Sequence, residues 1–208
     1  MAQDDTRELI IQTASKQFLL QGCKKVTMDN IATMMHISKR TIYEQFENKE
    51  ELLLACMNSH NDRTEQILKK CLSREEEPLI ATMLIIKISG DFLVSHAHLM
   101  EEIKDSYPDV YQRFTKDRPK EDENHVLVQL KKAQERGSIR PNANIEIASH
   151  MLINICKIMR EEHHLSIKER SRILSETTFT YLRGLMTTEA IELYNSKENE
   201  IKKSLARL

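Results

Sequence analysis

The stretch from Thr27 to Phe46, TMDNIATMMHISKRTIYEQF, constrains the fold of this 208-residue chain more than any other. Apolar residues in its first half recur at the i, i+3, i+4 and i+7 spacing of one helix face, namely Met28, Ile31, Ala32 and Met35. Thr27 stands where an N-cap hydroxyl belongs, and Ser38 offers a second N-cap. The stretch therefore predicts two short helices joined by a bend at residues 36–37, and packing on a third helix must hold them.

Helices on both sides of this stretch complete a small N-terminal domain. Asp5 is predicted to cap a preceding helix, which carries an apolar stripe and ends near Gly22. Asn48 is predicted to cap a following helix, with Glu51 as its partner in a capping box. The first fifty residues thus predict three short helices and the beginning of a long one.

The second short helix turns a polar face outward. Ile42 and Phe46, four residues apart, are predicted to point inward, and this arrangement is typical of a helix presented to the major groove of DNA. The chain as a whole has a formal net charge of −1. Between Lys16 and Tyr43, however, only one residue is acidic, Asp29, and five are basic: Lys16, Lys24, Lys25, Lys39 and Arg40. DNA phosphates interact with the charge of the surface that they contact, so the net charge of the whole chain does not exclude nucleic-acid binding.

These residues resemble the DNA-binding head of the TetR family of bacterial transcriptional regulators. The shared motifs occur here in the family's order and spacing at Gly22, Thr27, Ile31-Ala32, Ile37-Ser38, Thr41-Ile42-Tyr43, Phe46 and Lys49-Glu50-Glu51-Leu52. In one respect the chain departs from the pattern: the turn carries Met35-His36, where the family usually has small residues. This larger turn is expected to affect the angle between the two helices and the base preference rather than the fold.

The resemblance implies an all-α protein with a helix-turn-helix DNA-binding domain over residues 1–50 and a ligand-binding and dimerisation domain over residues 51–208. It implies a sequence-specific regulator, a repressor that a small-molecule effector releases from a palindromic double-stranded DNA operator. A transcriptional activator of the same fold is an alternative that the sequence does not separate from this one. A hypothesis from another class of protein is a helical metal-dependent enzyme, although no Gly-rich phosphate loop, nucleophile elbow or paired carboxylates support it.

Eight residues are predicted to contact DNA: Thr27, Ser38, Lys39, Arg40, Thr41, Tyr43, Gln45 and Lys49. Arg40 is the candidate for a bidentate contact with guanine, and Lys39 for a base edge or a flanking phosphate. The others suit phosphates, which position a protein without specifying sequence. A purely structural role stays open for several: Thr27 and Ser38 as caps, Tyr43 as packing, and the two cations as a solvated face.

Composition agrees with a helical protein, and no cofactor is expected. Four glycines, four prolines and no tryptophan suit an all-α fold, and 30% of the residues are charged. No signal peptide and no apolar run of membrane length are found, so a cytoplasmic location without membrane contact is expected. The cysteines lie far apart without a C-x-x-C spacing and are expected to be free thiols: Cys23, Cys56, Cys71 and Cys156. The eight histidines show no metal-ligand spacing.

The remaining chain is predicted to be helical. Residues 77–95 are apolar on nearly all sides and should form a central buried helix. By position, residues 145–160 and 168–186 correspond to the helices through which the family's subunits pair as a four-helix bundle. Effector-binding candidates, which alternatively fill the core, are Met83, Phe92, Met100, Tyr107, Tyr111, Phe114, Met151 and Cys156. Pro119 is predicted at a helix start, and residues 188–208 as a final helix.

Overall fold

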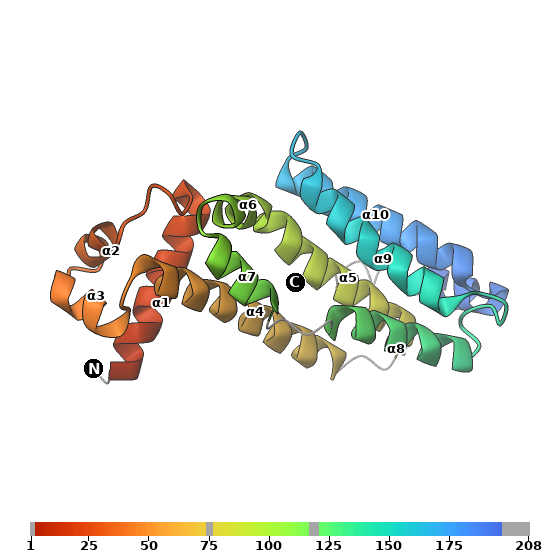
Figure 1. Ribbon diagram of the computed structural model, residues 1–208. Helices are drawn as coiled ribbons and strands as arrows, with labels where there is room; N and C mark the ends of the chain where they lie inside the picture. Colours follow the sequence, from red (N-terminus) through yellow and green to blue (C-terminus); the bar gives the residue numbers. More distant parts are fainter. Residues whose placement is uncertain (1–2, 74–76, 117–120, 197–208) are drawn as a thin grey trace. The chain divides into compact units, whose positions relative to one another are not determined.

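The computed structural model describes residues 3–73, 77–116 and 121–196 (Figure 1). Its helices are α1 (Gln3–Gln21), α2 (Met28–Met34), α3 (Lys39–Gln45), α4 (Lys49–Leu72), α5 (Pro78–Ser95), α6 (Ala97–Ser106), α7 (Pro108–Lys116), α8 (Glu121–Glu135), α9 (Ile145–Glu161) and α10 (Ile167–Leu185). Residues 188–196 are helical as well. Within the described ranges the only β-type pairing is one isolated bridge between Ile139 and Met186, so the predicted all-α fold is confirmed. Pro119 and residues 197–208 lie outside the described residues.

The chain divides into two compact units. The head unit comprises residues 1–63 and 96–118, and the body unit comprises residues 64–95 and 119–208. The head unit therefore includes α6 and α7, which follow the first fifty residues by a long interval in the sequence. The division into a DNA-binding domain over residues 1–50 and a regulatory domain over residues 51–208 concerns function, and it stays a prediction.

The core of the head unit is built from every one of its helices. Fully or almost fully buried apolar side chains come from α1 and α2, from Ile42 on α3, and from the beginning of α4. Ile103 of α6, with Val110 and Phe114 of α7, completes this core. Burial of one such side chain contributes about 1.5–3 kcal/mol. Because α2 and α3 have only seven residues each, this packing holds them rather than their own helix propensity.

One predicted cap and the partner in one predicted capping box differ from the structure. Helix α1 begins at Gln3, so the prediction that Asp5 caps it is wrong. Asn48 does cap α4, because its Oδ1 accepts a hydrogen bond of 2.9 Å from the backbone N–H of Glu51. The Glu51 carboxylate, however, accepts the backbone N–H of Glu47, at 2.7 Å, one residue before the expected partner.

In the body unit, α8, α9 and α10 pack around α5 (Figure 1). Twelve residues of α5 are buried, which confirms the predicted central helix. By length and composition α5 also qualifies as a membrane span, so the expectation that no segment does is wrong, yet 56% of its 18-residue window is buried inside the protein. At Gly90 of α5 an added Cβ would lie 2.1 Å from Leu174 Cδ2 of α10, so the glycine permits the close approach of these helices. Ser166 and Glu169 form the predicted capping box at the start of α10.

Candidate nucleic-acid interface

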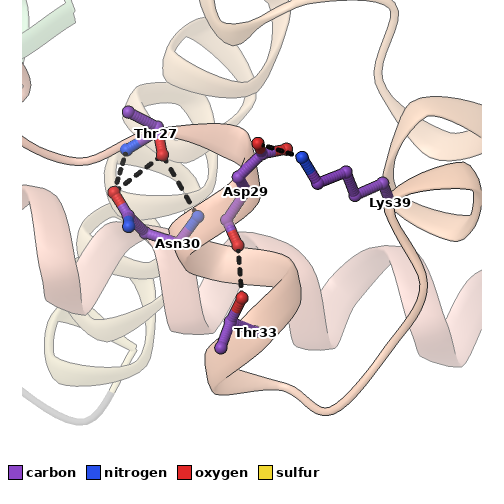
Figure 2. Close-up of polar contacts among 5 residues, drawn as sticks. All are labelled: Thr27, Asp29, Asn30, Thr33 and Lys39. Atoms are coloured by element: carbon purple, nitrogen blue, oxygen red, sulfur yellow. Dashed lines mark hydrogen bonds and ion pairs between the residues drawn. The ribbon is translucent and has the colours of Figure 1, made fainter.

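The helix-turn-helix begins at a capping box that the sequence predicted in part. Thr27 caps α2: its Oγ1 accepts the backbone N–H of Asn30 at 3.1 Å, and the Asn30 Oδ1 accepts the backbone N–H of Thr27 at 3.0 Å (Figure 2). Ser38 caps α3 in the same manner, with its Oγ accepting the backbone N–H of Thr41 at 3.0 Å. Caps of this kind stabilise a helix by about 0.5–2 kcal/mol. Both predicted caps are confirmed.

The turn between α2 and α3 carries Met35-His36, the larger residues by which this chain differs from the family pattern. Met35 is the C-cap of α2 and packs, partly buried, on the core of the head unit. His36 has a φ of +55°, the left-handed region in which an L side chain is strained, and it is exposed. The turn thus places Met35 against the core and leaves His36 in solvent. Their effect on base preference stays a prediction.

Helix α3 presents a mostly polar face to solvent. Lys39, Arg40 and Tyr43 are exposed, whereas Ile42 is completely buried. Thr41 and Gln45, also predicted to contact DNA, are half-buried. The end of the helix is held by Phe46, which is buried and whose ring lies 4.5 Å from the Arg7 guanidinium of α1. The side chains of α3 are therefore displayed from a well-anchored backbone.

Both cations at the start of α3 are paired with carboxylates. Lys39 Nζ forms an ion pair with Asp29 of α2 (Figure 2). Arg40 Nε donates to Glu44 Oε1 at 2.7 Å, one turn further along α3. These hydrogen bonds raise the pKa of Lys39 and of Arg40 above their ordinary values. The sequence reasoning missed Glu44, although its i, i+4 spacing from Arg40 is a recognisable signal for a helical ion pair.

Lys49 is engaged differently. Its ammonium lies 5.4 Å from the centre of the Tyr107 ring, a cation–π distance, and the residue is half-buried at the start of α4. Thr27, Ser38, Lys39, Arg40, Thr41, Tyr43, Gln45 and Lys49 all belong to one unit, and all of them lie on or next to α2, α3 and the start of α4. Their contact with DNA stays a prediction.

A carboxylate of α6 fixes the loop before α2. Glu102 Oε2 accepts the backbone N–H of Cys23 at 2.7 Å, and Oε1 accepts that of Lys24 at 2.8 Å. Burial opposes ionisation of Glu102, but these backbone hydrogen bonds outweigh it and lower its pKa. Burial, and next the charge of Glu102, raises the pKa of Cys23 to about 12. Nothing in the sequence signals this contact, because its partners lie 78 and 79 residues apart.

Gly22, the predicted end of the first helix, lies beside the same carboxylate. It follows the last residue of α1 with a φ of +83°, and its backbone N–H donates to Phe18 O at 2.9 Å. An added Cβ would come within 2.5 Å of Glu102 Oε2. The glycine is therefore required both by its conformation and by the approach of Glu102.

The effector-binding candidates belong to different units. Four of them, Met100, Tyr107, Tyr111 and Phe114, pack against or within the core of the head unit. In the body unit, Met83 and Cys156 are buried in the core, Phe92 is half-buried, and Met151 is exposed. The structure therefore gives several of them a packing role, and their grouping into one ligand site stays a prediction.

The described histidine and cysteine side chains form neither a metal cluster nor a disulfide. Among the described residues no group of three or more His, Cys, Asp or Glu side chains is placed to hold a metal ion. His60 and His96 lie edge to face with ring centroids 4.8 Å apart. Burial, followed by the charges of His96 and Arg63, lowers the pKa of His60 to about 4. All four cysteines are free thiols, as predicted.

The region that contains α2 and α3 also matches a known protein family. Residues 10–56 match the family model described as "Bacterial regulatory proteins, tetR family". The N-terminal domain of this chain is therefore similar to that of the TetR family. The resemblance predicted from residues 22–52 is thus confirmed. The family consists of transcriptional regulators, which is the class of protein that the sequence predicted.

The curated relatives share mainly the N-terminal domain with this chain. The uncharacterized HTH-type transcriptional regulator YhgD of Bacillus subtilis is 46% identical over 48 residues, which cover 23% of this chain and 25% of YhgD. The DNA-binding transcriptional repressor TetR of Mycobacteroides abscessus is 34% identical over 62 residues, which cover 29% of this chain and 33% of that repressor. The chain therefore matches a quarter to a third of the length of these relatives.

A solved structure extends the likeness to the whole fold. The crystal structure of a TetR transcription regulator from Haloarcula marismortui superimposes with a TM-score of 0.75, and the match covers 88% of this chain and 100% of that protein. Its sequence identity is 14%, so this likeness concerns the fold alone.

Proposed function

We propose that this TetR-family protein is a sequence-specific DNA-binding transcriptional regulator. The observation that carries the proposal is the display of Lys39, Arg40 and Tyr43 on α3 while Ile42 anchors the helix in the core. An α-helix with its side chains is about 10–12 Å in diameter, which fits the major groove with its width of about 12 Å. The capped ends and the packed Phe46 hold these side chains in fixed positions, as base recognition requires.

The regulator acts as a homodimer on a palindromic operator. Helix α9 carries an exposed apolar stripe formed by Ile147, Met151 and Ile158, which share one face at spacings of four and seven residues. On α10 an exposed face without charged side chains follows the same spacings: Ile173, Thr177, Thr180 and Gly184. Two-fold pairing covers such faces and doubles the DNA contact of a single recognition helix.

A charged residue introduced into the apolar stripe of α9 tests whether the protein dimerises through this helix. Met151→Glu is expected to shift the protein to monomer in sedimentation velocity, because the carboxylate would be buried between subunits. Val128→Glu on α8 is the matched control, since Val128 is 45% exposed and Met151 is 44% exposed. Equal dimerisation of both variants would contradict pairing through α9.

A repressor released by a small molecule is the form of regulation we favour. One relative of the N-terminal domain is itself a DNA-binding transcriptional repressor. An effector would weaken DNA binding if it bound better to an arrangement of the two heads that does not fit the operator. An activator would have the same fold, and the position of the operator relative to the promoter separates the two. A cytoplasmic location accords with this function and stays a prediction.

The first experiment is a gel shift with DNA from upstream of the protein's own gene, repeated over a series of salt concentrations. Tight binding to a palindrome, with affinity that falls steeply as salt rises, is the expected result. Arg40→Ala should weaken this binding roughly ten- to a hundredfold. Arg113→Ala, which removes an exposed arginine of α7, serves as the control. Binding that is weak and equal on all sequences, or an Arg40→Ala variant of unchanged affinity, would contradict the proposal.

A further inference from the structure

The DNA-facing helix carries acidic groups beside its cations. Arg40 and Glu44 are bonded to each other while their side chains remain 87% and 54% exposed. Lys39 is paired in turn with Asp29, which belongs to the first turn of α2. Surfaces that bind DNA without selectivity offer cations to the phosphates. Here each of the two cations has a carboxylate that a phosphate would have to displace, so the pairs weaken contact with DNA backbone in general.

Folding does not explain the Arg40–Glu44 pair. An i, i+4 pair between side chains this exposed contributes little to stability, because water solvates both partners almost as well. Helix α3 is already fixed by the Ser38 cap and by burial of Ile42 and Phe46. The pair therefore lies on the solvent-exposed side of α3 and is not required for the stability of this helix.

The geometry of the pair leaves specific groups available. Only Arg40 Nε is used by Glu44, so both terminal nitrogens of the guanidinium remain donors. Glu44 uses Oε1, which leaves Oε2 as an acceptor. In the major groove, guanine offers two acceptors, O6 and N7, to a bidentate arginine, and cytosine offers its N4 amino group to a carboxylate. Thymine or guanine at the second position would place an acceptor oxygen against the Glu44 carboxylate.

We propose that the Arg40–Glu44 pair reads a guanine and a neighbouring cytosine of the operator, with Glu44 as a specificity-determining residue. Arg40 donates to the guanine while Glu44 both orients the guanidinium and accepts from the cytosine. Asp29 acts in the same direction by keeping Lys39 from binding phosphates of any sequence. Selectivity thus arises as much from repulsion of wrong sequences as from attraction to the right one. This inference rests on the proposed function.

The test compares the full-length wild-type protein with Glu44→Ala and Glu44→Gln in selection from a random duplex library. Glu47→Gln is the control, because it removes a neighbouring exposed carboxylate just beyond α3. Wild-type protein and the control should select a guanine with a neighbouring cytosine. Replacement of that cytosine should weaken wild-type binding roughly tenfold. The Glu44 variants should lose most of this discrimination and bind random DNA several-fold more tightly, and their plot of log affinity against log salt should be steeper by about one unit.

The outcomes separate this inference from the function on which it rests. If the wild-type protein selects no sequence at all, the proposed function fails and the inference with it. If the wild-type protein selects a sequence and the Glu44 variants select the same bases with the same discrimination, only the inference fails. Loss of selectivity in Glu47→Gln as well would also overturn it, because the effect would then follow net charge rather than position. Circular dichroism of each variant verifies that α3 remains folded.

Discussion

Glu102 provides the most direct test of how the head unit is held together, and Glu102→Gln is the perturbation. The carboxylate uses both oxygens, one for the backbone N–H of Cys23 and one for that of Lys24. Glutamine keeps a single acceptor oxygen, so its amide group must face one of the two N–H donors. At least one hydrogen bond is therefore lost, although the side chain keeps nearly the same shape.

The size of the effect follows from which bond is lost. The bond to Lys24 is exposed, and water can replace it, whereas the bond to Cys23 is partly buried. A buried donor left without a partner costs about 1–3 kcal/mol, and hydrogen bonds to charged groups lie in the same range. We expect Glu102→Gln to lower the free energy of unfolding by about 1–3 kcal/mol at neutral pH. Domains of this kind have about 5–15 kcal/mol in total, so the loss is easily measured.

The pH dependence gives an independent check. Hydrogen bonds in the folded state lower the pKa of Glu102 from its ordinary value of 4.5. The carboxylate therefore contributes its full stability above pH 4.5 and loses it as the pH falls through the folded-state pKa. Urea unfolding followed by circular dichroism at pH 7 and at successively lower pH should show the difference between wild type and variant shrinking below pH 4.5. Protein concentration is held fixed, because the stability of the proposed dimer would depend on it.

Asp105→Asn is the control, since Asp105 is an exposed acid on the same helix. It should have little effect at any pH. The reasoning is refuted if Glu102→Gln is as stable as wild type at pH 7, or if their difference is the same on both sides of pH 4.5. It is also refuted if Asp105→Asn shows the same pH-dependent loss.

Three other substitutions have defined expectations. Gly90→Ala should destabilise the body unit by about 1–3 kcal/mol in thermal unfolding, because the added Cβ would overpack against Leu174 of α10. Gly22→Ala should cost about 1–3 kcal/mol, and a double-mutant cycle with Glu102→Ala should show a smaller cost once the clashing carboxylate is gone. The pKa of His60 is lowered from 6.5 to about 4 in the folded protein, so as the pH falls the unfolded state takes up the proton at a higher pH than the folded state does. The free energy of unfolding should therefore decrease as the pH drops from 6.5 to 4. His60→Gln should flatten this part of the plot of stability against pH.

Features that depend on neighbouring residues were predictable from the sequence. Thr27, Ser38 and Asn48 were identified as caps because a cap acts on N–H groups only two or three residues away. The helix over residues 77–95 was predictable because an almost wholly apolar segment must be buried on every side. Helix bounds followed within a few residues, and the exception at Asp5 arose because α1 begins two residues earlier.

Features that depend on distant partners were not predictable from one sequence. The contact of Glu102 with the loop before α2 joins segments almost eighty residues apart, and so does the packing of α6 and α7 in the head unit. For the same reason the sequence did not show that Met100 and Tyr111, two of the predicted effector-binding residues, pack on the core of the head unit. The Arg40–Glu44 pair, by contrast, was predictable from the sequence, because its partners are only four residues apart on one helix.

The ion pairs change what the local charge of the head predicts. Of the five basic residues between Lys16 and Tyr43, two are neutralised by carboxylates in the free protein. Lys16, Lys24 and Lys25 are exposed and form no ion pair with a described residue. Each phosphate that a cation neutralises adds about 0.9 to the slope of log affinity against log salt. Random DNA is expected to leave the two ion pairs intact. Its salt dependence should therefore be shallower than five free basic residues would give. A regulator built in this way depends on base contacts for much of its affinity, which fits a chain whose overall charge is −1.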